Sequence, residues 1–411
     1  MNFFKNHMEI LISIIFISCV TDGNIKKEDV LVKDEDFSWD AIDLEHTQDF
    51  CHGVYQQEIY LKRRKNKNLS FGGDKISSSD YALSLHKIHD VCVSDPSHLS
   101  NFVKSYFDVY RVVGENQKES VLLTSYFEPV INGVNEAVYP YTMPIYGVPQ
   151  DLIEVVITKQ KLYGRFKKPP SSHIETQKII EYFKRHEIDK KTLKNTKVFA
   201  WVDPIEGFFM QIQGSGQINI LDQKKKKVRL GYASQNGHSF YPIGRSLLGV
   251  IPREKMSMDS IKSYLRGLSS QKALEIMHSD PSYVFFQELQ GRPKTSNGTE
   301  VVDGHTVATD NEFFDKGILG ILKFKDPDQG GKKIHRFVLN QDRGGAIRGP
   351  NRVDLFWGTG DEAGHKAGAI LQKDANLMYL KPKNSALRLW KLAMVNDRDE
   401  QKGIQIQSVG V

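Results

Sequence analysis

Three aspartates in the C-terminal part of the chain stand at the edges of apolar runs. Asp310 lies in TVATDNEFF, Asp342 in NQDRGGAIRG and Asp354 in NRVDLFWGTG. A strand that ends at each position would bring its carboxyl group to the rim of a sheet. Carboxyl groups that converge in a cleft suit glycosidic bond cleavage, in which a carboxylic acid protonates the departing oxygen. Capping of turns by the same aspartates is the competing interpretation.

The residues around Asp354 predict where its carboxyl group points. On a strand, Asp354 and Phe356 share one face, while Val353, Leu355 and Trp357 share the other. A carboxyl group beside aromatic, partly desolvated surface has a raised pKa, which a proton donor near neutral pH requires.

A second set of polar residues lies upstream. Gln211 and Gln213 would occupy one face of a predicted strand, and Ser215, Asn236 and His238 follow. Amides, a hydroxyl and an imidazole can hydrogen-bond sugar hydroxyls and N-acetyl groups, although strand-edge and turn roles fit equally well. His238 has no serine or cysteine motif beside it, so a nucleophilic triad has little support.

The N-terminus is typical of an export signal. Lys5 precedes the apolar run Ile10 to Ile17, which is too short to span a bilayer as a stable anchor, and Ser18-Cys19 follows. This pattern is similar to a bacterial lipobox, in which Cys19 would be acylated. Ordinary signal cleavage and a wrongly assigned first residue are the alternatives. Either export route takes the mature chain out of the cytosol. The charged residues 20–45 predict a polar tether.

Two further cysteines allow three interpretations. Cys51 and Cys92 can form a disulfide in an oxidising compartment, remain as two buried thiols, or bind zinc together with His86 and His89. The zinc site is the least favoured, because positions i and i+6 of a helix lie about 120° apart.

Composition and patterning indicate a folded α+β protein that is mainly β. The 411 residues are 39% hydrophobic and 26% charged with a net charge of +6, too weak for the basic stripe of a nucleic-acid-binding protein. Helical patterns cover residues 79–91, 173–187 and 256–279, and a further helix begins at Asp95-Pro96. Short β-branched and aromatic runs fill much of 121–235 and 283–357, which predicts two β-rich bodies.

Six blocks in order resemble the membrane-bound lytic murein transglycosylase A family with its C-terminal three-aspartate (3D) segment. They lie between Val121 and Pro382 and read TSYFEPVING, YPYTMPIYGVPQDL, AWVDPIEGFFMQIQGSG, GYASQNGHSFYPIGRSLL, PSYVFF and QDRGGAIRGPNRVDLFWGTGDEAG. The resemblance implies a double-psi β-barrel domain, a second β-barrel domain inserted into it, and a groove between them. The expected division is a lipoprotein-type signal at 1–19, the linker at 20–45, the first barrel at 46–127 and 285–400, and the insert at 128–284.

The resemblance also implies an activity and its residues. Such proteins are peptidoglycan lytic exotransglycosylases, lyases that cleave the β-1,4 bond between N-acetylmuramic acid and N-acetylglucosamine and leave a 1,6-anhydro end. Asp354 would act as general acid and then as base, with Asp342 and Asp310 in support. The implied glycan-contacting residues are Thr124, Tyr126, Gln211, Gln213, Ser215, Asn236, His238, Phe356 and Trp357.

No cofactor or metal is expected, and nucleic acid is not an expected partner. The expected partners are peptidoglycan glycan strands, the outer membrane through a lipid on Cys19, and cell-wall enzyme complexes. The expected location is the cell envelope, on the periplasmic side of the outer membrane. Two alternatives remain open, namely a murein hydrolase of the same fold that uses water and a non-catalytic peptidoglycan-binding lipoprotein.

This chain departs from the family pattern in two places. Ser125 and Phe127 stand where glycine and tyrosine are usual, and Asp315-Lys316-Gly317 replaces a proline-glycine turn. Glu128 is a further carboxylate near the first block, for which a catalytic role is not favoured.

Overall fold

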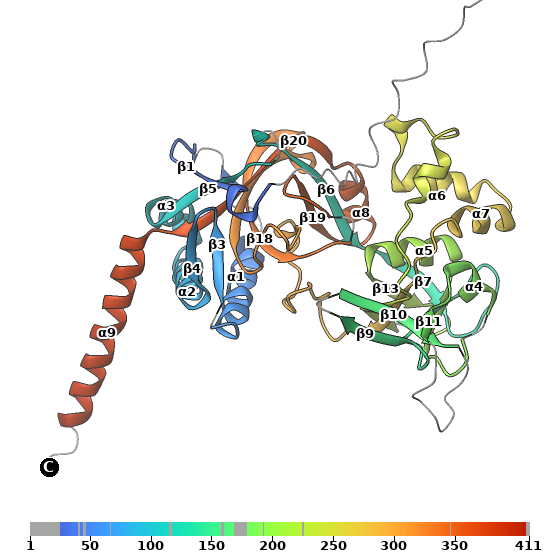
Figure 1. The fold of residues 1–411 in the computed structure, drawn as a ribbon, viewed down its shortest axis with the longest axis horizontal. Coiled ribbons are helices and arrows are strands. Elements are labelled where there is room, and N and C mark those ends of the chain that lie inside the picture. The colour runs from blue at the N-terminus through green and yellow to red at the C-terminus, as the bar shows by residue number, and fades with distance from the viewer. Residues whose placement is uncertain are drawn as a thin grey trace, which may run out of the picture.

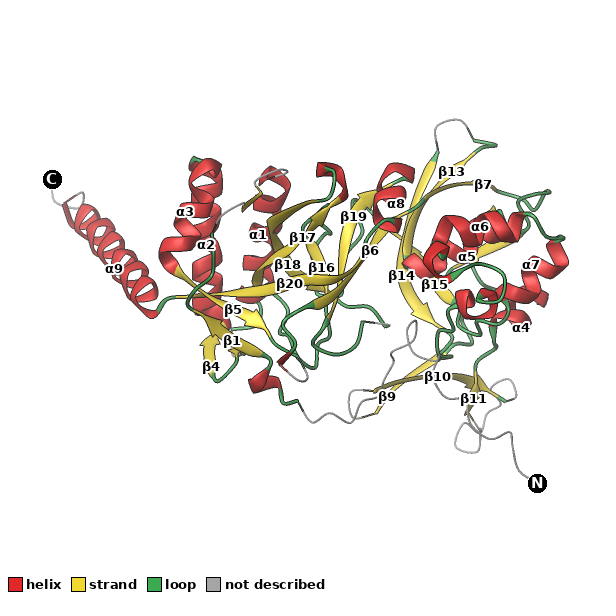
Figure 2. Cartoon of the chain, turned by 90° about the horizontal axis from the view of Figure 1, so that it is seen from above, coloured by secondary structure: helices red, strands yellow, loops and turns green. Residues whose placement is uncertain are grey.

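Two β-barrels lie side by side in the computed structural model, with helices at both ends (Figures 1 and 2). The signal segment and Cys19 lie outside the described residues. Within the described part, no helix is long and apolar enough to cross a membrane. The structure describes residues 25–39, 42–43, 47–65, 67–114, 117–157, 160–167, 179–191, 193–223, 226–345 and 347–407.

The first barrel is a closed ring of six strands. In ring order these are β20 (Leu371–Pro382), β17 (Leu319–Asp326), β18 (Lys332–Asp342), β16 (Thr306–Ala308), β19 (Arg352–Thr359) and β6 (Val121–Glu128). β20 pairs with both β17 and β6, which closes the ring and leaves no free edge among these strands. The pairs β16–β18 and β6–β19 are parallel and the others antiparallel. The sheet of this barrel is therefore mixed.

Helices and short strands cover one end of this barrel. They are α1 (Thr47–Lys62), β3 (Asn68–Phe71), β4 (Asp74–Ser77), α2 (Ser78–Ser94), α3 (Leu99–Tyr106), β5 (Phe107–Val112) and α9 (Asn384–Gln407). Ser77 caps α2 by accepting a hydrogen bond from the backbone of Asp80, and Asp95 caps the short 3-10 helix Pro96–His98 before α3. Both predicted helices are thus confirmed. Trp390 of α9 packs in the same core against Phe102.

The prediction of a polar tether over residues 20–45 is wrong for its described part. β1 (Leu31–Asp34) follows the 3-10 helix η1 (Lys27–Asp29) and pairs with β5, and Val30 and Leu31 are buried. β2 (Ile42–Asp43) pairs with β18, where Asp43 forms an ion pair of 2.6 Å with buried Arg336. The buried guanidinium needs carboxylate partners, and the high charge of this segment supplies one.

The second barrel is formed by six strands in the order β15 (Val284–Glu288), β14 (Lys227–Gln235), β13 (Ser215–Ile220), β7 (Val130–Val134), β12 (Val198–Val202) and β8 (Met143–Tyr146). A bridge between Gly147 and Phe286 brings the two end strands together, so this barrel is nearly closed. We propose 129–288 as the extent of the insert, since the strands change barrel after Glu128 and again after Glu288.

Helices cover the outer end of the second barrel. They are α5 (Pro204–Gln213), α6 (Met258–Arg266) and α7 (Ser270–Met277), which share a core around Phe208 and Phe209, and α4 (Arg185–Lys190) lies nearby. A separate sheet contains β9 (Ile153–Ile157), β10 (Gln160–Phe166) and β11 (Ile179–Glu181). Of the predicted helix over 173–187, residues 179–184 are not helical, since they hold β11 and the segment after it, while 185–187 form the start of α4.

The prediction that Gln211 and Gln213 lie on a strand is also wrong. Asp203 accepts hydrogen bonds from the backbones of Ile205 and Glu206, Pro204 occupies the first helical position, and Gly214 ends α5 in the left-handed region at φ 79°. These residues start and end a helix. Its apolar residues are equally common in strands, so composition alone does not predict the helix.

Cys51 and Cys92 form a disulfide that joins α1 to α2, with Cα atoms 5.7 Å apart. The interpretations as zinc ligands or as two free thiols are therefore wrong. The Nδ1 atom of His86 lies 3.3 Å from Glu58, and the ring of His89 lies beside Tyr55.

Replacing Cys51 and Cys92 by alanine should lower the free energy of unfolding by about 2 to 4 kcal/mol, because the bridge closes a loop with a sequence separation of 41. Thermal unfolding with and without reductant measures this. Reductant should lower the melting temperature of the wild-type chain and leave that of the double variant unchanged. Equal melting temperatures for the oxidised and reduced wild-type protein would contradict the prediction.

Candidate active site

Asp354 lies on β19 directly opposite Thr124 of β6. The parallel register aligns Asp354 with Thr124 and Phe356 with Tyr126. The Thr124 hydroxyl donates a hydrogen bond of 2.7 Å to Oδ1 of Asp354. The predicted alternation is confirmed, since Val353, Leu355 and Trp357 belong to the barrel core while Asp354 is half-buried on the other face.

The surroundings of Asp354 favour its protonated form. Burial raises its pKa to about 6, the hydrogen bond from Thr124 and the charge of Arg352 oppose this rise, and the negative charge of Asp342 adds to it. Arg352 lies two positions earlier on the same face of β19, and its Nη2 donates to the Thr124 hydroxyl at 3.2 Å. The carboxyl group can therefore hold or release a proton near neutral pH.

Asp342 ends β18 and is held in place by several donors. Its Oδ1 accepts hydrogen bonds from the backbone N–H groups of Ser296 at 2.9 Å and Arg343 at 2.8 Å. Its Oδ2 accepts one from the Tyr126 hydroxyl at 2.9 Å, and the Tyr126 ring lies 5.1 Å from that of Phe356. Asp342 thereby connects β18 to Tyr126, which lies two positions after Thr124 on the same face of β6.

Asp310 organises two loops rather than facing open space. It is 4% exposed, and its carboxylate accepts hydrogen bonds from the backbones of Glu312 at 3.1 Å and Gly349 at 2.8 Å. These contacts fix the segment after β16 beside the segment before β19. The competing interpretation of this aspartate as a turn residue fits its contacts.

Sequence reasoning did not identify Lys316 and Arg352 as part of this arrangement. The ammonium of Lys316 donates to the carbonyl and hydroxyl of Thr309 and to Oδ1 of Asn340 at 2.9 to 3.0 Å. Burial lowers its pKa to about 7, and the charges of Asp342 and Asp310 oppose this shift. Period-two alternation from Asp354 would have found Arg352, whereas no local pattern indicates the contacts of Lys316.

Two predicted aromatic contacts with glycan are not supported by their positions. Trp357 is 8% exposed and faces the barrel interior. Its ring lies near the ring of Phe324 and the guanidinium of Arg336. Phe356 is on the Asp354 face but only 1% exposed, because Tyr126 packs against it. Neither ring offers a free surface to a sugar, so we remove both from the glycan-contacting set.

The polar residues of the insert that are predicted to contact glycan also differ in exposure, and two of them are buried. Gln211 is 3% exposed and bonds Arg185 and the carbonyl of Val284. Asn236 is 1% exposed and bonds the carbonyls of Phe183 and Pro281. Both amides are used inside the second barrel, so we remove these two as well.

The remaining three insert residues are half-buried. His238 contacts the carbonyl of Tyr182 at 2.9 Å, Gln213 accepts a hydrogen bond from the backbone of Phe127 on β6 at 3.3 Å, and Ser215 begins β13. Gln213 and Ser215 therefore lie where the insert meets the strand of Thr124 and Tyr126. His238 is held against the insert instead.

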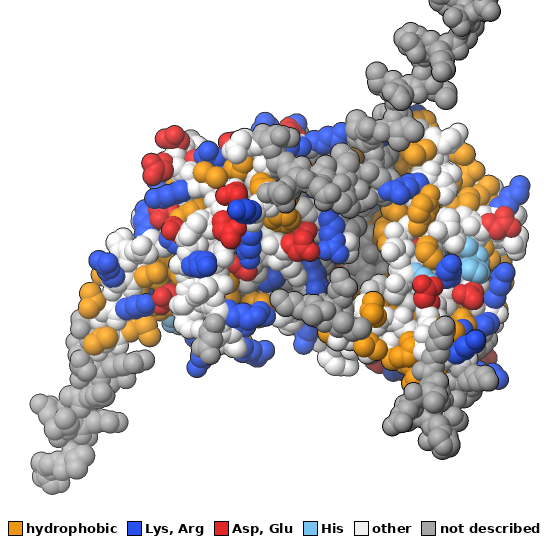
Figure 3. All heavy atoms as spheres, viewed as in Figure 1, with side chains coloured by type: hydrophobic (Ala, Val, Ile, Leu, Met, Phe, Trp, Pro, Cys, Tyr) orange, Lys and Arg blue, Asp and Glu red, His pale blue; other side chains and the backbone are white. Residues whose placement is uncertain are grey.

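Glu128 connects the two barrels at the point where the chain crosses between them. Its fully buried carboxylate lies 3.0 Å from Nε of Arg229 on β14 and accepts a hydrogen bond of 2.8 Å from the Thr359 hydroxyl on β19. Nη1 of Arg229 also donates to the carbonyl of Gly291, on the segment that returns from the insert. Glu128 therefore has a structural position. Over the described surface, basic and acidic side chains lie interspersed with apolar and uncharged ones (Figure 3).

The departures from the family pattern lie outside the contacts of Asp354. The Ser125 hydroxyl donates to the carbonyl of Ala367 in α8 (Asp361–Gly368), and Phe127 packs so closely on Gly364 that an added Cβ would lie 2.8 Å from its ring. No group of three or more histidine, cysteine or acidic side chains that could hold a metal ion occurs among the described residues.

The fold and the aspartate segment define a two-barrel protein with an inserted second barrel and a 3D domain. The family described as "MltA specific insert domain" matches residues 122–287, and the "3D domain" family matches residues 305–381. The chain therefore contains both of these domains and is similar to the membrane-bound lytic murein transglycosylase A family.

Individual proteins agree with this assignment. The membrane-bound lytic murein transglycosylase A of Escherichia coli K12 is 28% identical over 269 residues, which cover 64% of this chain and 66% of the relative. A crystal structure of MltA from Neisseria gonorrhoeae is 28% identical with a TM-score of 0.63 and covers 82% of this chain and 90% of that one. The membrane-bound lytic murein transglycosylase of Agrobacterium tumefaciens, 24% identical, shares the fold with a TM-score of 0.67 over 82% of this chain and 93% of that one.

Replacing Asp354 by asparagine should stabilise the folded chain above pH 6. A carboxyl group with a raised folded-state pKa binds its proton more tightly when folded, so stability falls as pH rises from about 4 to about 6. Asparagine does not ionise and avoids this loss, which corresponds to about 2 to 3 kcal/mol. Chemical denaturation at a series of pH values measures the difference, which should vanish below about pH 4. A constant difference at all pH values would show that Asp354 has an ordinary pKa.

Proposed function

We propose that this protein is a peptidoglycan lytic transglycosylase. It would cleave the β-1,4 bond between N-acetylmuramic acid and N-acetylglucosamine without water and leave a 1,6-anhydro end. The proposal rests on similarity to a family whose curated relatives carry that activity in their names, and on one observation in this chain. That observation is the half-buried Asp354, whose pKa is raised to about 6 by burial.

The first step needs a proton donor. Protonated Asp354 would transfer its proton to the bridging oxygen while the bond from that oxygen to C1 of the muramic acid breaks. Positive charge then develops on the sugar ring, and the new aspartate carboxylate lies where it can stabilise that charge. A pKa near the working pH lets one group be both a competent acid beforehand and a competent base afterwards.

The second step uses the substrate's own nucleophile. The Asp354 carboxylate would take the proton of the C6 hydroxyl as its oxygen attacks C1, which closes the anhydro ring and returns the carboxyl group to its starting state. Neither step consumes a water molecule. A single aspartate is enough because the nucleophile is intramolecular.

Neighbouring residues have distinct supporting tasks. Thr124 donates to Oδ1 of Asp354 and orients the carboxyl group, which leaves Oδ2 for the substrate. Arg352 offers positive charge beside the carboxylate that forms in the first step. The negative charge of Asp342 opposes the effect of Arg352 and so keeps the pKa of Asp354 raised. The hydrogen bond that Asp342 accepts from Tyr126 holds β18 beside β6. Tyr126, Gln213 and Ser215 remain our candidates for contact with glycan.

The products formed from purified sacculi test the reaction. We expect muropeptides with anhydro ends, and Asp354→Asn should reduce their release by about 100-fold to 10,000-fold, the usual contribution of general acid–base catalysis. Asp374→Asn is the matched control, because Asp374 is an exposed aspartate of β20 and its replacement should leave release unchanged. Mass spectrometry separates the products, since hydrolysis adds one water.

Other outcomes favour the alternatives. Hydrated ends from the wild-type protein would identify a hydrolase, in which a second carboxylate activates water. Glycan binding without any release by the wild-type protein would identify a peptidoglycan-binding lipoprotein. Full activity of the asparagine variant would remove Asp354 from the mechanism.

We propose further that the mature chain is a lipoprotein anchored to the outer membrane through Cys19 and faces the periplasm. The support is the signal pattern before Ser18-Cys19 and the names of the relatives, which are called membrane-bound. Complexes with other cell-wall enzymes remain a prediction.

Replacement of Cys19 by alanine should abolish incorporation of labelled fatty acid and shift the protein from the membrane fraction, because acyl chains supply the apolar contact that holds a lipoprotein. Fractionation of labelled cells measures both effects. Retention of label by the variant would place the lipid elsewhere, and an unlabelled wild-type chain would favour ordinary signal cleavage.

A further inference from the structure

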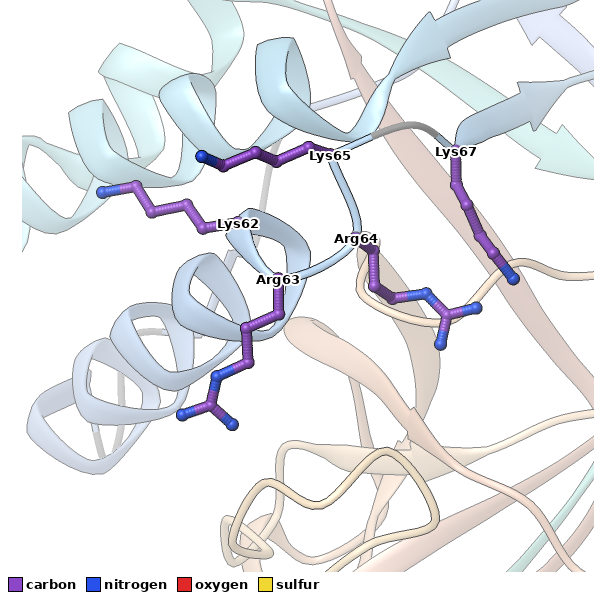
Figure 4. A pocket seen from close by; sticks show the side chains of 5 residues that line it. All are labelled: Lys62, Arg63, Arg64, Lys65 and Lys67. Carbon is purple, nitrogen blue, oxygen red and sulfur yellow. The ribbon is translucent and has the colours of Figure 1, made fainter.

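A run of basic residues forms a charged corner at the end of α1. We call Lys62, Arg63, Arg64, Lys65 and Lys67 the basic corner, and they line a shallow hollow between the end of α1 and the start of β3. Figure 4 shows their side chains spread around this turn, with Lys62 and Lys65 directed to one side and Arg64 and Lys67 to another. All five are exposed.

Most of this charge has no partner within the described part of the protein. Lys62 pairs with Glu58 at 2.5 Å, and the Arg64 guanidinium lies 5.2 Å from the centre of the Tyr60 ring. Arg63, Lys65 and Lys67 have no acidic side chain within ion-pair distance among the residues that the structure describes. A basic residue in the last helical turn complements the helix dipole, but this explanation does not extend to Lys65 and Lys67, which lie beyond α1.

The N-terminal segment of the fold lies beside the same corner. Lys27 of η1 forms an ion pair of 2.7 Å with Asp315, whose other carboxylate oxygen accepts a hydrogen bond from the backbone of Ser70 at 2.8 Å. Ser70 is three residues after Lys67 on the same β-hairpin. The start of the described chain is thus fixed, through Asp315, to the strand β3 that begins just after Lys67 of the basic corner.

The distance from the proposed anchor is short. Cys19 precedes Ile25, the first described residue, by six positions, which span at most about 20 Å when fully extended. A lipid on Cys19 would therefore keep this side of the first barrel near the bilayer, at a distance where a cluster of cations can reach the headgroups. Clusters of lysine and arginine beside a lipid anchor bind anionic headgroups, each contributing roughly fivefold in affinity.

We propose that the basic corner rests on an anionic phospholipid surface and binds its phosphate groups beside the lipid anchor. The arginine guanidinium groups suit phosphate oxygens through paired N–H donors, and the lysines add compact charge. This second contact would restrict the rotation that a flexible lipid anchor alone leaves free. The inference rests on the proposed envelope location and is independent of the proposed chemistry.

The consequence concerns the first barrel. Leu61 and Tyr60, at the end of α1, pack on Gly317, where an added Cβ would lie 2.6 Å from the Leu61 side chain. Gly317 belongs to the segment that holds Lys316 and follows Asp310. A basic corner held at the membrane would therefore keep the barrel that carries the three aspartates, rather than the insert, nearer to the lipid surface.

Vesicle sedimentation tests this contact. The mature chain from position 19, with Cys19→Ser to prevent lipidation, retains every described residue. We expect it to sediment with vesicles of phosphatidylcholine and phosphatidylglycerol at low salt, but not at high salt and not with phosphatidylcholine alone, because exposed charges are screened. The variant Arg63→Gln with Lys65→Gln and Lys67→Gln should bind roughly 100-fold more weakly.

A matched control removes the same charge elsewhere on the first barrel. Lys332, Lys333 and Lys373 are exposed residues of β18 and β20, and their replacement by glutamine should leave vesicle binding within about twofold of the wild-type value. Muropeptide release from soluble glycan by both variants should equal that of the wild-type chain. This readout separates failure of the inference from failure of the proposed activity.

Three results would overturn the inference. One is absence of binding to the anionic vesicles at low salt. A second is an equal loss for the two triple variants, which would mean that net charge rather than the basic corner matters. A third is unchanged vesicle binding together with lost sedimentation on purified peptidoglycan, which would identify the carboxylates of the wall as the partner.

Discussion

The parallel pairing of β6 with β19 is the constraint on which the site depends. It sets Thr124 opposite Asp354 and Tyr126 opposite Phe356, so a single register fixes the donor, the carboxyl group and the aromatic pair beside them. A shift by one residue would turn Asp354 into the core and Val353 outwards. Closure of the first barrel prevents such a shift, because β6 is also paired with β20 on its other side.

The same closed barrel accounts for the chemistry of the carboxyl group. Burial against the barrel wall raises the pKa of Asp354, and among the described residues the hydroxyl of Thr124 donates a hydrogen bond to it. Asp342 and Asp310 are different, because backbone N–H groups donate to each of them. Three aspartates of one sequence pattern thus divide into one carboxyl group suited to proton transfer and two that hold the surrounding loops. Glu128 and Arg229 then set the insert against these strands.

The corrections share a physical cause. Amides suit sugars, which favours Gln211 and Asn236 as glycan contacts, but amides also satisfy buried backbone carbonyls, and residue type does not distinguish the two uses. Trp357 follows the predicted alternation and points into the core, so an aromatic residue of the motif is not exposed merely by belonging to it. The apolar run before Gly214 suits either a helix or a strand, and the capping by Asp203 decided for the helix.

The sequence by itself determined the resemblance to the transglycosylase family, the mainly β character, the order of the blocks and the face of β19 on which Asp354 lies, because these depend on local order and on side-chain alternation. It also contained the basic run that ends α1. Only the tertiary structure decided that Cys51 bonds to Cys92, that residues 25–39 and 42–43 belong to the fold, and which polar residues are buried. The raised pKa of Asp354 was also decided by the tertiary structure. Each of these depends on contacts between residues far apart in the chain, and local sequence does not encode which distant group will exclude water from a side chain or donate a hydrogen bond to it.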